Sequence, residues 1–115
     1  MPSKINPGAA LDAFGGLAND NRLAIFRLLV QAGPEGMPAG AIAEKLDTPA
    51  SSLSFHLAHL TRAGLIIQRR ESRSLIYSAN FDTMNALIAF MTENCCGGRS
   101  CAPAGRASPT KRKRA

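Results

Sequence analysis

Apolar residues recur at helical spacing over most of the 115-residue chain, and this spacing predicts five helices. Leu11 and Phe14 predict a short first helix that ends at the glycines 15–16. The run 23–30 is apolar over most of a helical circumference, and the Asn-Asp-Asn cluster at 19–21 can cap it. We therefore expect this second helix to lie at the centre of the core.

Two more helices follow, separated by a short break. Pro38 opens the third predicted helix, and the Asp-Thr-Pro sequence at 47–49 ends it. Ser51 or Ser52 can cap a fourth helix, which runs to about Ala63 before a glycine. The pattern indicates two helices joined by a tight turn.

After this glycine the period of the apolar pattern changes. Residues 65–68 and 75–78 favour β-structure, and the polar stretch 69–74 between them predicts a hairpin. From Phe81 helical spacing returns and predicts a fifth helix that ends near Asn94. The predicted fold class is mainly α with a small β-hairpin, in the order of a winged helix-turn-helix.

The basic charge is concentrated at one end of the chain. Of the net charge of +6, five units come from residues 102–115, which contain no acidic side chain. We predict one folded domain over 1–101 and a flexible basic tail over 102–115. No apolar run approaches the roughly 20 residues that a membrane span needs, and the first residues lack the apolar core of a signal peptide. The sequence therefore predicts a cytoplasmic protein without a membrane partner.

The fourth predicted helix has two different faces. At 100° per residue Leu53, Leu57 and Leu60 share one stripe, whereas the other side is small, hydroxylated and basic. No acidic residue occurs between Pro49 and Glu71, which suits contact with phosphates and base edges. The candidate DNA-binding residues of this helix are Ser51, Ser52, Ser54, Phe55, His56, His59 and Arg62.

Two of these candidates have alternative roles. Phe55 can contact a thymine methyl group, or it can pack against the hairpin or a partner subunit. His56 falls near the edge of the apolar stripe, so we interpret it first as a structural, hydrogen-bonded histidine and second as a phosphate contact. His59 points outward and is the better candidate for DNA.

The predicted hairpin carries three further candidates. Arg69, Arg70 and Arg73 flank Glu71 near the predicted tip. Beside a helix in the major groove, these guanidinium groups would meet the backbone or the minor groove. The alternative is a solvated turn.

These segments resemble the ArsR-type metalloregulators over about residues 8–96. The run Ser-Ser-Leu-Ser-Phe-His-Leu at 51–57, with Ala-Gly-Leu-Ile at 63–66, is similar to the recognition helix of that family and its exit. Residues 17–29 resemble its second helix. The resemblance implies a homodimer joined through its first and last helices, which binds double-stranded operator DNA and releases it when an inducer binds.

The chain departs from two well-known branches of this family. It has no cysteine in the helix before the turn, at 41–45, and no histidine in the last predicted helix, at 81–94. Instead it carries Cys95, Cys96 and Cys101, similar to a branch that binds trivalent arsenic at the end of the last helix.

The number of cysteines favours a metalloid over zinc. Soft thiolates select soft ions, and structural zinc takes four ligands, whereas trivalent arsenic or antimony is satisfied by three thiolates in a pyramid. Adjacent cysteines on a helix diverge by about 100°, so Cys95 and Cys96 can share one ion only if the helix frays there. The glycines 97–98 allow such a bend and let Cys101 fold back.

We therefore predict a repressor that releases its operator when As(III), or Sb(III), binds Cys95, Cys96 and Cys101. The alternatives are a thiol redox switch and a metal-independent winged-helix DNA-binding protein. An enzyme is disfavoured, because Cys101 and Arg106 enclose four residues where the phosphatase-like loop of one arsenate reductase class needs five. No histidine lies near the cysteines in sequence to serve as a general base.

Overall fold

The computed structural model describes residues 4–98, which form five helices and a three-stranded antiparallel sheet. The helices are α1 (Pro7–Leu17), α2 (Asp20–Ala32), α3 (Ala39–Leu46), α4 (Ala50–Arg62) and α5 (Phe81–Met91), and a short 3₁₀ segment, η1 (Cys95–Gly98), follows. The strands are β1 (Met37–Pro38), β2 (Ile66–Glu71) and β3 (Ser74–Ala79), in the order β1-β3-β2. The predicted fold class, a mainly helical winged helix-turn-helix, is confirmed.

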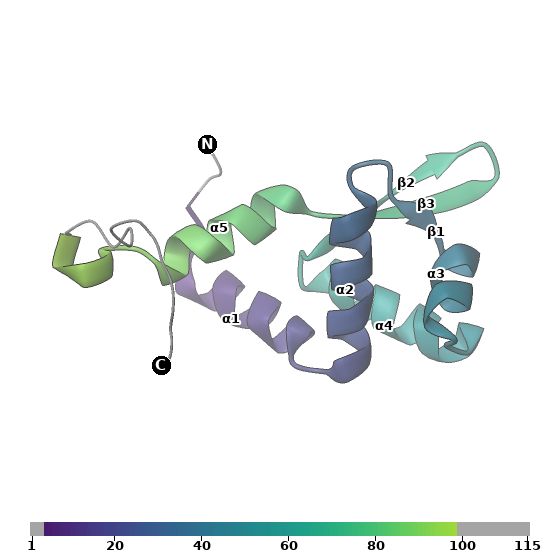
Figure 1. Ribbon diagram of the computed structural model, residues 1–115, viewed down its shortest axis with the longest axis horizontal. Coiled ribbons are helices and arrows are strands. Elements are labelled where there is room, and N and C mark those ends of the chain that lie inside the picture. The colour runs from purple at the N-terminus through teal and green to yellow at the C-terminus, as the bar shows by residue number, and fades with distance from the viewer. Residues whose placement is uncertain (1–3, 99–115) are drawn as a thin grey trace, which may run out of the picture.

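The elements are arranged along one long axis. Figure 1 shows α1 and α5 at one end, with η1 beyond them, and α2, α3, α4 and the hairpin at the other. One core joins the helices to the base of the hairpin, and its largest fully buried side chains are Ile25, Leu29, Ile42, Leu53, Leu60, Leu65 and Ile66. The prediction that α2 is central is confirmed, because three of its apolar residues belong to this core. Among residues 4–98, no helix is long and apolar enough to cross a membrane.

The caps of α2 agree with the sequence pattern. The Asn19 side chain accepts hydrogen bonds from the backbone N–H groups of Asn21 and Arg22, at 2.9 and 3.0 Å. Gly33 ends the helix with a φ of 83°, in the left-handed region that glycine adopts without penalty.

The first helix extends past the glycines that were predicted to end it. Both glycines lie inside α1, which continues to Leu17. Gly16 is buried, and a Cβ there would lie 2.9 Å from Leu65 Cδ1 and 3.0 Å from Ala63 Cβ. This glycine therefore allows α1 to pack closely against the end of α4, a role in tertiary packing that local propensity does not reveal.

The predicted serine cap of α4 is wrong. The helix begins at Ala50, and Pro49 occupies the N-cap position without a side-chain hydrogen bond. The carbonyl of Pro49 accepts the first helical bond from Leu53 N–H, at 2.9 Å. Ser51 and Ser52 consequently lie in the first turn, where both are exposed.

The hairpin is longer and tighter than predicted. Glu71 pairs with Ser74, so only Ser72 and Arg73 form the loop, and half of the predicted polar stretch 69–74 belongs to β2. Strand β1 was not predicted, because two residues are too few to show a period. Its approach to β3 requires Gly36, which has a φ of 70° and where a Cβ would collide with the carbonyl of Tyr77.

The fifth helix ends at Met91, three residues before the predicted end. Asn80 caps its start by accepting a hydrogen bond from Thr83 N–H at 3.2 Å. Beyond the helix, Asn94 and Cys96 both have a φ of 56°. The cysteines of η1 therefore do not continue α5.

Candidate nucleic-acid interface and thiol segment

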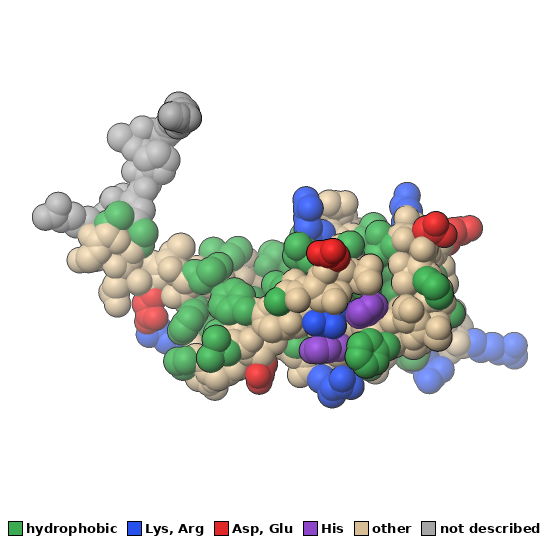
Figure 2. All heavy atoms as spheres, turned by 90° about the horizontal axis from the view of Figure 1, so that it is seen from below, with side chains coloured by type: hydrophobic (Ala, Val, Ile, Leu, Met, Phe, Trp, Pro, Cys, Tyr) green, Lys and Arg blue, Asp and Glu red, His purple; other side chains and the backbone are tan. Residues whose placement is uncertain are grey.

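The orientation of α4 is the one that its leucine spacing predicts. Leu53, Leu57 and Leu60 are buried, whereas the serines of the first two turns, Phe55 and Arg62 are exposed. Figure 2 shows one face of the molecule on which histidine side chains lie beside Lys and Arg side chains. The exposed side of α4 thus presents hydroxyl groups and positive charge and no carboxylate.

Phe55 lies on this exposed side. Its side chain is 61% exposed, so it is not packed against the hairpin, one of the alternatives considered above. Its ring makes edge contacts with the rings of His56 and His59, at centroid distances of 5.6 and 6.5 Å. A large ring in this position is available to a base or to a partner subunit.

His56 is buried, in agreement with its first interpretation as a structural histidine. The residue is only 8% exposed, and within residues 4–98 its Nδ1 has no hydrogen-bond partner. Burial agrees with the structural interpretation and not with an outward phosphate contact, although the hydrogen bond expected of such a histidine is not found at Nδ1. The physical reason is the helical period, which turns His56 inward beside Leu53 and Leu60.

His59 lies between basic side chains. Partial desolvation, followed by the positive charges of Arg22 and Arg62 and by His56, lowers the pKa of His59 below its ordinary value. This shift favours the neutral imidazole at pH 7. Arg22 was not among the candidates predicted from the sequence. It is held in place because its Nε donates to the carbonyl of Gly16 at 2.7 Å.

Arg69 makes intramolecular contacts that the sequence did not predict. Its guanidinium donates to the carbonyls of Glu35 (2.8 Å) and Pro34 (3.3 Å) and, through Nε, to the Glu71 carboxylate (2.9 Å). This side chain therefore connects β2 to the turn between α2 and β1. The cause is that successive side chains of a strand point to opposite faces. Residues 67, 69 and 71 lie on one face of β2, and residues 66, 68 and 70 lie on the other.

Arg70 and Arg73 remain candidates for DNA contact. Both are exposed, one near the end of β2 and the other in the two-residue loop. Within the described residues neither side chain has a hydrogen bond or ion pair. They place two positive charges at the tip of the hairpin.

The thiol segment begins four residues after α5. The Sγ atoms of Cys95 and Cys96 lie 3.8 Å apart, because the left-handed backbone at Cys96 breaks the helical divergence of adjacent side chains. Two thiolates that each bind one tetrahedral ion at about 2.3 Å also lie about 3.8 Å apart. Cys95 is disulfide-bonded in this structure, so the two sulfurs could share a thiophilic ion only after that bond is reduced. Cys101, the third predicted ligand, lies outside the described residues, and within 4–98 no three His, Cys, Asp or Glu side chains form a metal site.

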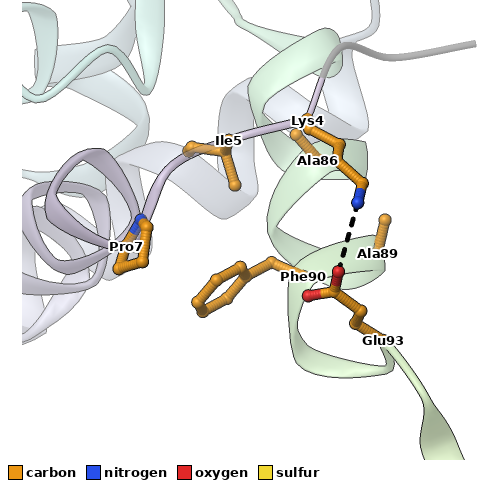
Figure 3. A pocket seen from close by; sticks show the side chains of 7 residues that line it. All are labelled: Lys4, Ile5, Pro7, Ala86, Ala89, Phe90 and Glu93. Atoms are coloured by element: carbon orange, nitrogen blue, oxygen red, sulfur yellow. Dashed lines mark hydrogen bonds and ion pairs between the residues drawn. The ribbon is translucent and has the colours of Figure 1, made fainter.

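A groove lies next to this segment. Figure 3 shows it between the N-terminal residues and the last turns of α5, with Ile5, Pro7 and Phe90 among its lining residues. Its volume is about 280 Å³. Lys4 closes one side through an ion pair of 3.3 Å with Glu93, which links the chain before α1 to the residue two positions before Cys95.

The fold and the basic face of α4 define a winged helix-turn-helix DNA-binding protein. Residues 17–69 match the family described as "Helix-turn-helix domain". The HTH-type transcriptional regulator YgaV of Escherichia coli (strain K12) is 31% identical over 80 residues, which cover 70% of this chain and 79% of that protein. The chain belongs to the family of helix-turn-helix transcriptional regulators.

Two further similarities extend over most of the chain. The transcriptional activator HlyU of Vibrio cholerae is 29% identical over 79% of this chain and 82% of that protein, and a solved HlyU structure superposes with a TM-score of 0.61, 27% identity and coverage of 77% and 97%. Mb0332 of Mycobacterium bovis is described as a homodimeric winged helix-turn-helix DNA-binding domain and a possible ArsR-family regulator. It has a TM-score of 0.57 and 25% identity, with coverage of 86% of this chain and 96% of that one.

The contacts of Arg69 predict a mutational effect on DNA binding that differs from that of Arg73. We expect Arg69→Ala to weaken duplex DNA binding by loosening the hairpin, while the slope of log K against log salt stays unchanged. Arg73→Ala, the matched control, should lower that slope by about one, because a phosphate contact displaces a condensed cation. Fluorescence anisotropy across a KCl series measures both, and an equal loss of slope in Arg69→Ala would return this residue to the DNA interface.

Proposed function

We propose that the protein is a homodimeric transcriptional repressor that binds double-stranded operator DNA and releases it when trivalent arsenic binds its thiol segment. The observation that carries the proposal is the orientation of α4, whose exposed side is hydroxylated, basic and free of acid. The thiol segment supplies the sensing half of the proposal, as a separate hypothesis. The two halves have separate tests.

DNA binding follows from the chemistry of two surfaces. Ser51, Ser52 and Ser54 of α4 can hydrogen-bond base edges or phosphates in the major groove. Arg70 and Arg73 extend from the hairpin toward the neighbouring backbone or the minor groove. Helix α4 would therefore read sequence, while the hairpin would position the protein on the duplex.

A dimer is supported by the apolar face at the opposite end of the molecule. Leu11 of α1 is 69% exposed, and Ile88 and Met91 of α5 are 50% and 62% exposed. Three exposed large apolar side chains on two neighbouring helices form an interaction surface. A second copy of the chain is the occupant we propose, in keeping with the homodimeric domain of Mb0332.

Arsenic sensing rests on three thiols. The Sγ atoms of Cys95 and Cys96 lie 3.8 Å apart, and the third thiolate in the proposal is Cys101. Arsenic binding requires the reduced form of Cys95, which is disulfide-bonded in the structure. Three thiolates complete the coordination of As(III) or Sb(III), whose lone pair occupies the fourth direction. Hard cations such as magnesium and calcium have no oxygen ligand in this set.

His59 gives the DNA proposal a pH signature. Its pKa in the free protein is lowered, and a DNA phosphate beside it would raise that pKa, so binding would take up a proton. The affinity for DNA should therefore rise as the pH falls from 8 to 6 at constant ionic strength. It should level off below the pKa that His59 has in the free protein. Anisotropy titrations of the wild type and His59→Gln test this, and the same pH dependence in both would exclude His59 from the interface.

The dimer proposal predicts the effect of a charge in the apolar face. Met91→Glu should shift the protein toward monomer, because association would bury an unpaired carboxylate. Ile67→Glu, at a residue that is 52% exposed on the hairpin, is the matched control and should leave the dimer intact. Sedimentation equilibrium measures the association, and a wild type that stays monomeric at micromolar concentration would contradict the proposal.

The sensing proposal predicts a separation of two activities. Cys95→Ser, Cys96→Ser and Cys101→Ser should each bind DNA as the wild type does and lose the response to arsenite, because two thiolates leave one coordination position to water. In the wild type, arsenite should weaken DNA binding by about 5- to 150-fold, the range of ordinary allosteric coupling. Thr92→Ser keeps all three thiols and serves as the control.

The same titration distinguishes the alternative functions. A variant without any of the three cysteines that still released DNA on addition of arsenite would place the sensor elsewhere. A wild type that ignored arsenite and antimonite but responded to peroxide would be a thiol redox switch. A wild type that bound DNA and responded to none of these would be a metal-independent DNA-binding protein.

A further inference from the structure

A second groove separates α4 from the hairpin. Its volume is about 320 Å³, and its polar lining residues are Ser54, Thr61 and Arg62 of α4 with Gln68 of β2 and Tyr77 of β3. Two elements that are proposed to contact DNA therefore form its two walls. No carboxylate lines the groove.

The strand register explains why Gln68 and Tyr77 meet there. They are direct cross-strand partners, so their side chains lie on the same face of the hairpin. Arg70 and Leu75 are the next pair toward the tip on that face. Arg69 lies on the other face and contacts the turn before β1, so the two sides of the hairpin have different tasks.

The polar groups of this groove are available to a ligand. Within residues 4–98, no hydrogen bond or ion pair engages the side chains of Ser54, Arg62, Gln68 or Tyr77. Thr61 differs, because its hydroxyl donates to the carbonyl of Leu57 at 2.8 Å. Four unengaged side chains, one cationic and three neutral, can donate hydrogen bonds into one groove.

The geometry of a DNA duplex indicates which ligand the groove between α4 and the hairpin would bind. A sugar-phosphate strand separates the major groove from the minor groove. If α4 occupies the major groove and Arg73 reaches the neighbouring minor groove, that strand passes between α4 and the hairpin. Phosphate oxygens accept hydrogen bonds from Arg, Ser, Gln and Tyr side chains alike, which matches the donors found there.

We infer that the groove between α4 and the hairpin binds a phosphodiester of the DNA backbone, with Gln68 and Tyr77 as contacts in addition to Ser54 and Arg62. The inference rests on the proposed DNA binding and adds to it the position of one sugar-phosphate strand of the duplex. Gln68 and Tyr77 belong to strands, outside the helix and basic loop on which sequence motifs concentrate. They would fix the register of the protein on the duplex without reading bases.

The neutral donors have a signature that differs from that of the arginines. Gln68→Ala and Tyr77→Phe should each weaken binding by about three- to tenfold, the range for a lost hydrogen bond, on selected and random duplexes alike. The salt slope should not change, since an uncharged donor displaces no cation. Arg62→Gln should lower the slope by about one, and Gln31→Ala, at the other glutamine of the chain, should change nothing.

A backbone substitution locates the contact. The probe is a duplex selected from a random pool by the wild-type protein, in which single phosphates are replaced one at a time by uncharged methylphosphonates. We expect one position per half-site at which the wild type and Gln31→Ala lose affinity and the Gln68→Ala/Tyr77→Phe double variant loses clearly less. Thermal unfolding checks that the variants are folded, and Tyr77→Phe alone keeps the ring and its packing.

The outcomes separate this inference from the function on which it rests. A wild type that binds no duplex would remove the proposed DNA binding and the inference with it. A wild type that binds, with phosphate-sensitive positions that respond equally in the double variant, would overturn the inference alone. The inference is supported if Gln68→Ala and Tyr77→Phe lose affinity at an unchanged salt slope and the double variant is less sensitive to a methylphosphonate at one position per half-site.

Discussion

The burial of the leucine stripe of α4 determines what the rest of the molecule can do. Leu53, Leu57 and Leu60 are nearly inaccessible to solvent, and burying each stabilises the fold by about 1.5–3 kcal/mol. Because the side chains of a helix are related by a fixed rotation, these three positions set the rotation of α4 about its axis. The hydroxyls and Arg62 are thereby turned outward, while His56 is turned inward, with no hydrogen bond to its Nδ1 from the described part of the chain.

The hairpin needs support, because two strands alone are marginally stable in water. Strand β1 adds a third strand at its base, and Gly36 lets the preceding turn approach β3 closely. Arg69 fastens the same turn to β2 through two backbone carbonyls. These contacts hold the hairpin at a defined distance from α4, so the groove between them has walls from two anchored elements.

Periodicity predicted the helices and the hairpin, because their apolar faces repeat within one segment. It failed for residues whose role depends on a neighbour that is distant in sequence. Gly16 leaves room for the Leu65 side chain, and Arg22 acts on His59 of α4 only in the folded chain. Arg69 was misplaced because its segment was interpreted as a loop, and only strand alternation separates it from Arg70. The cysteines were found by composition, and the left-handed turn at Cys96 provides the fraying that the hypothesis required.

The proposed switch must carry a change at the thiols to a distant DNA interface. Helix α5 connects them, since its 11 residues span about 16 Å at 1.5 Å per residue. At its start Asn80 donates its N–H to the carbonyl of Leu65 at 2.8 Å, which joins α5 to the exit of α4 and the base of the hairpin. At its end Glu93 is tied to Lys4, before α1. An ion that prefers one geometry of the thiol segment would thus bias the conformation of a helix that is attached at both ends. The affinity for DNA would change by the difference between the ion's affinities for the DNA-bound and the DNA-free protein.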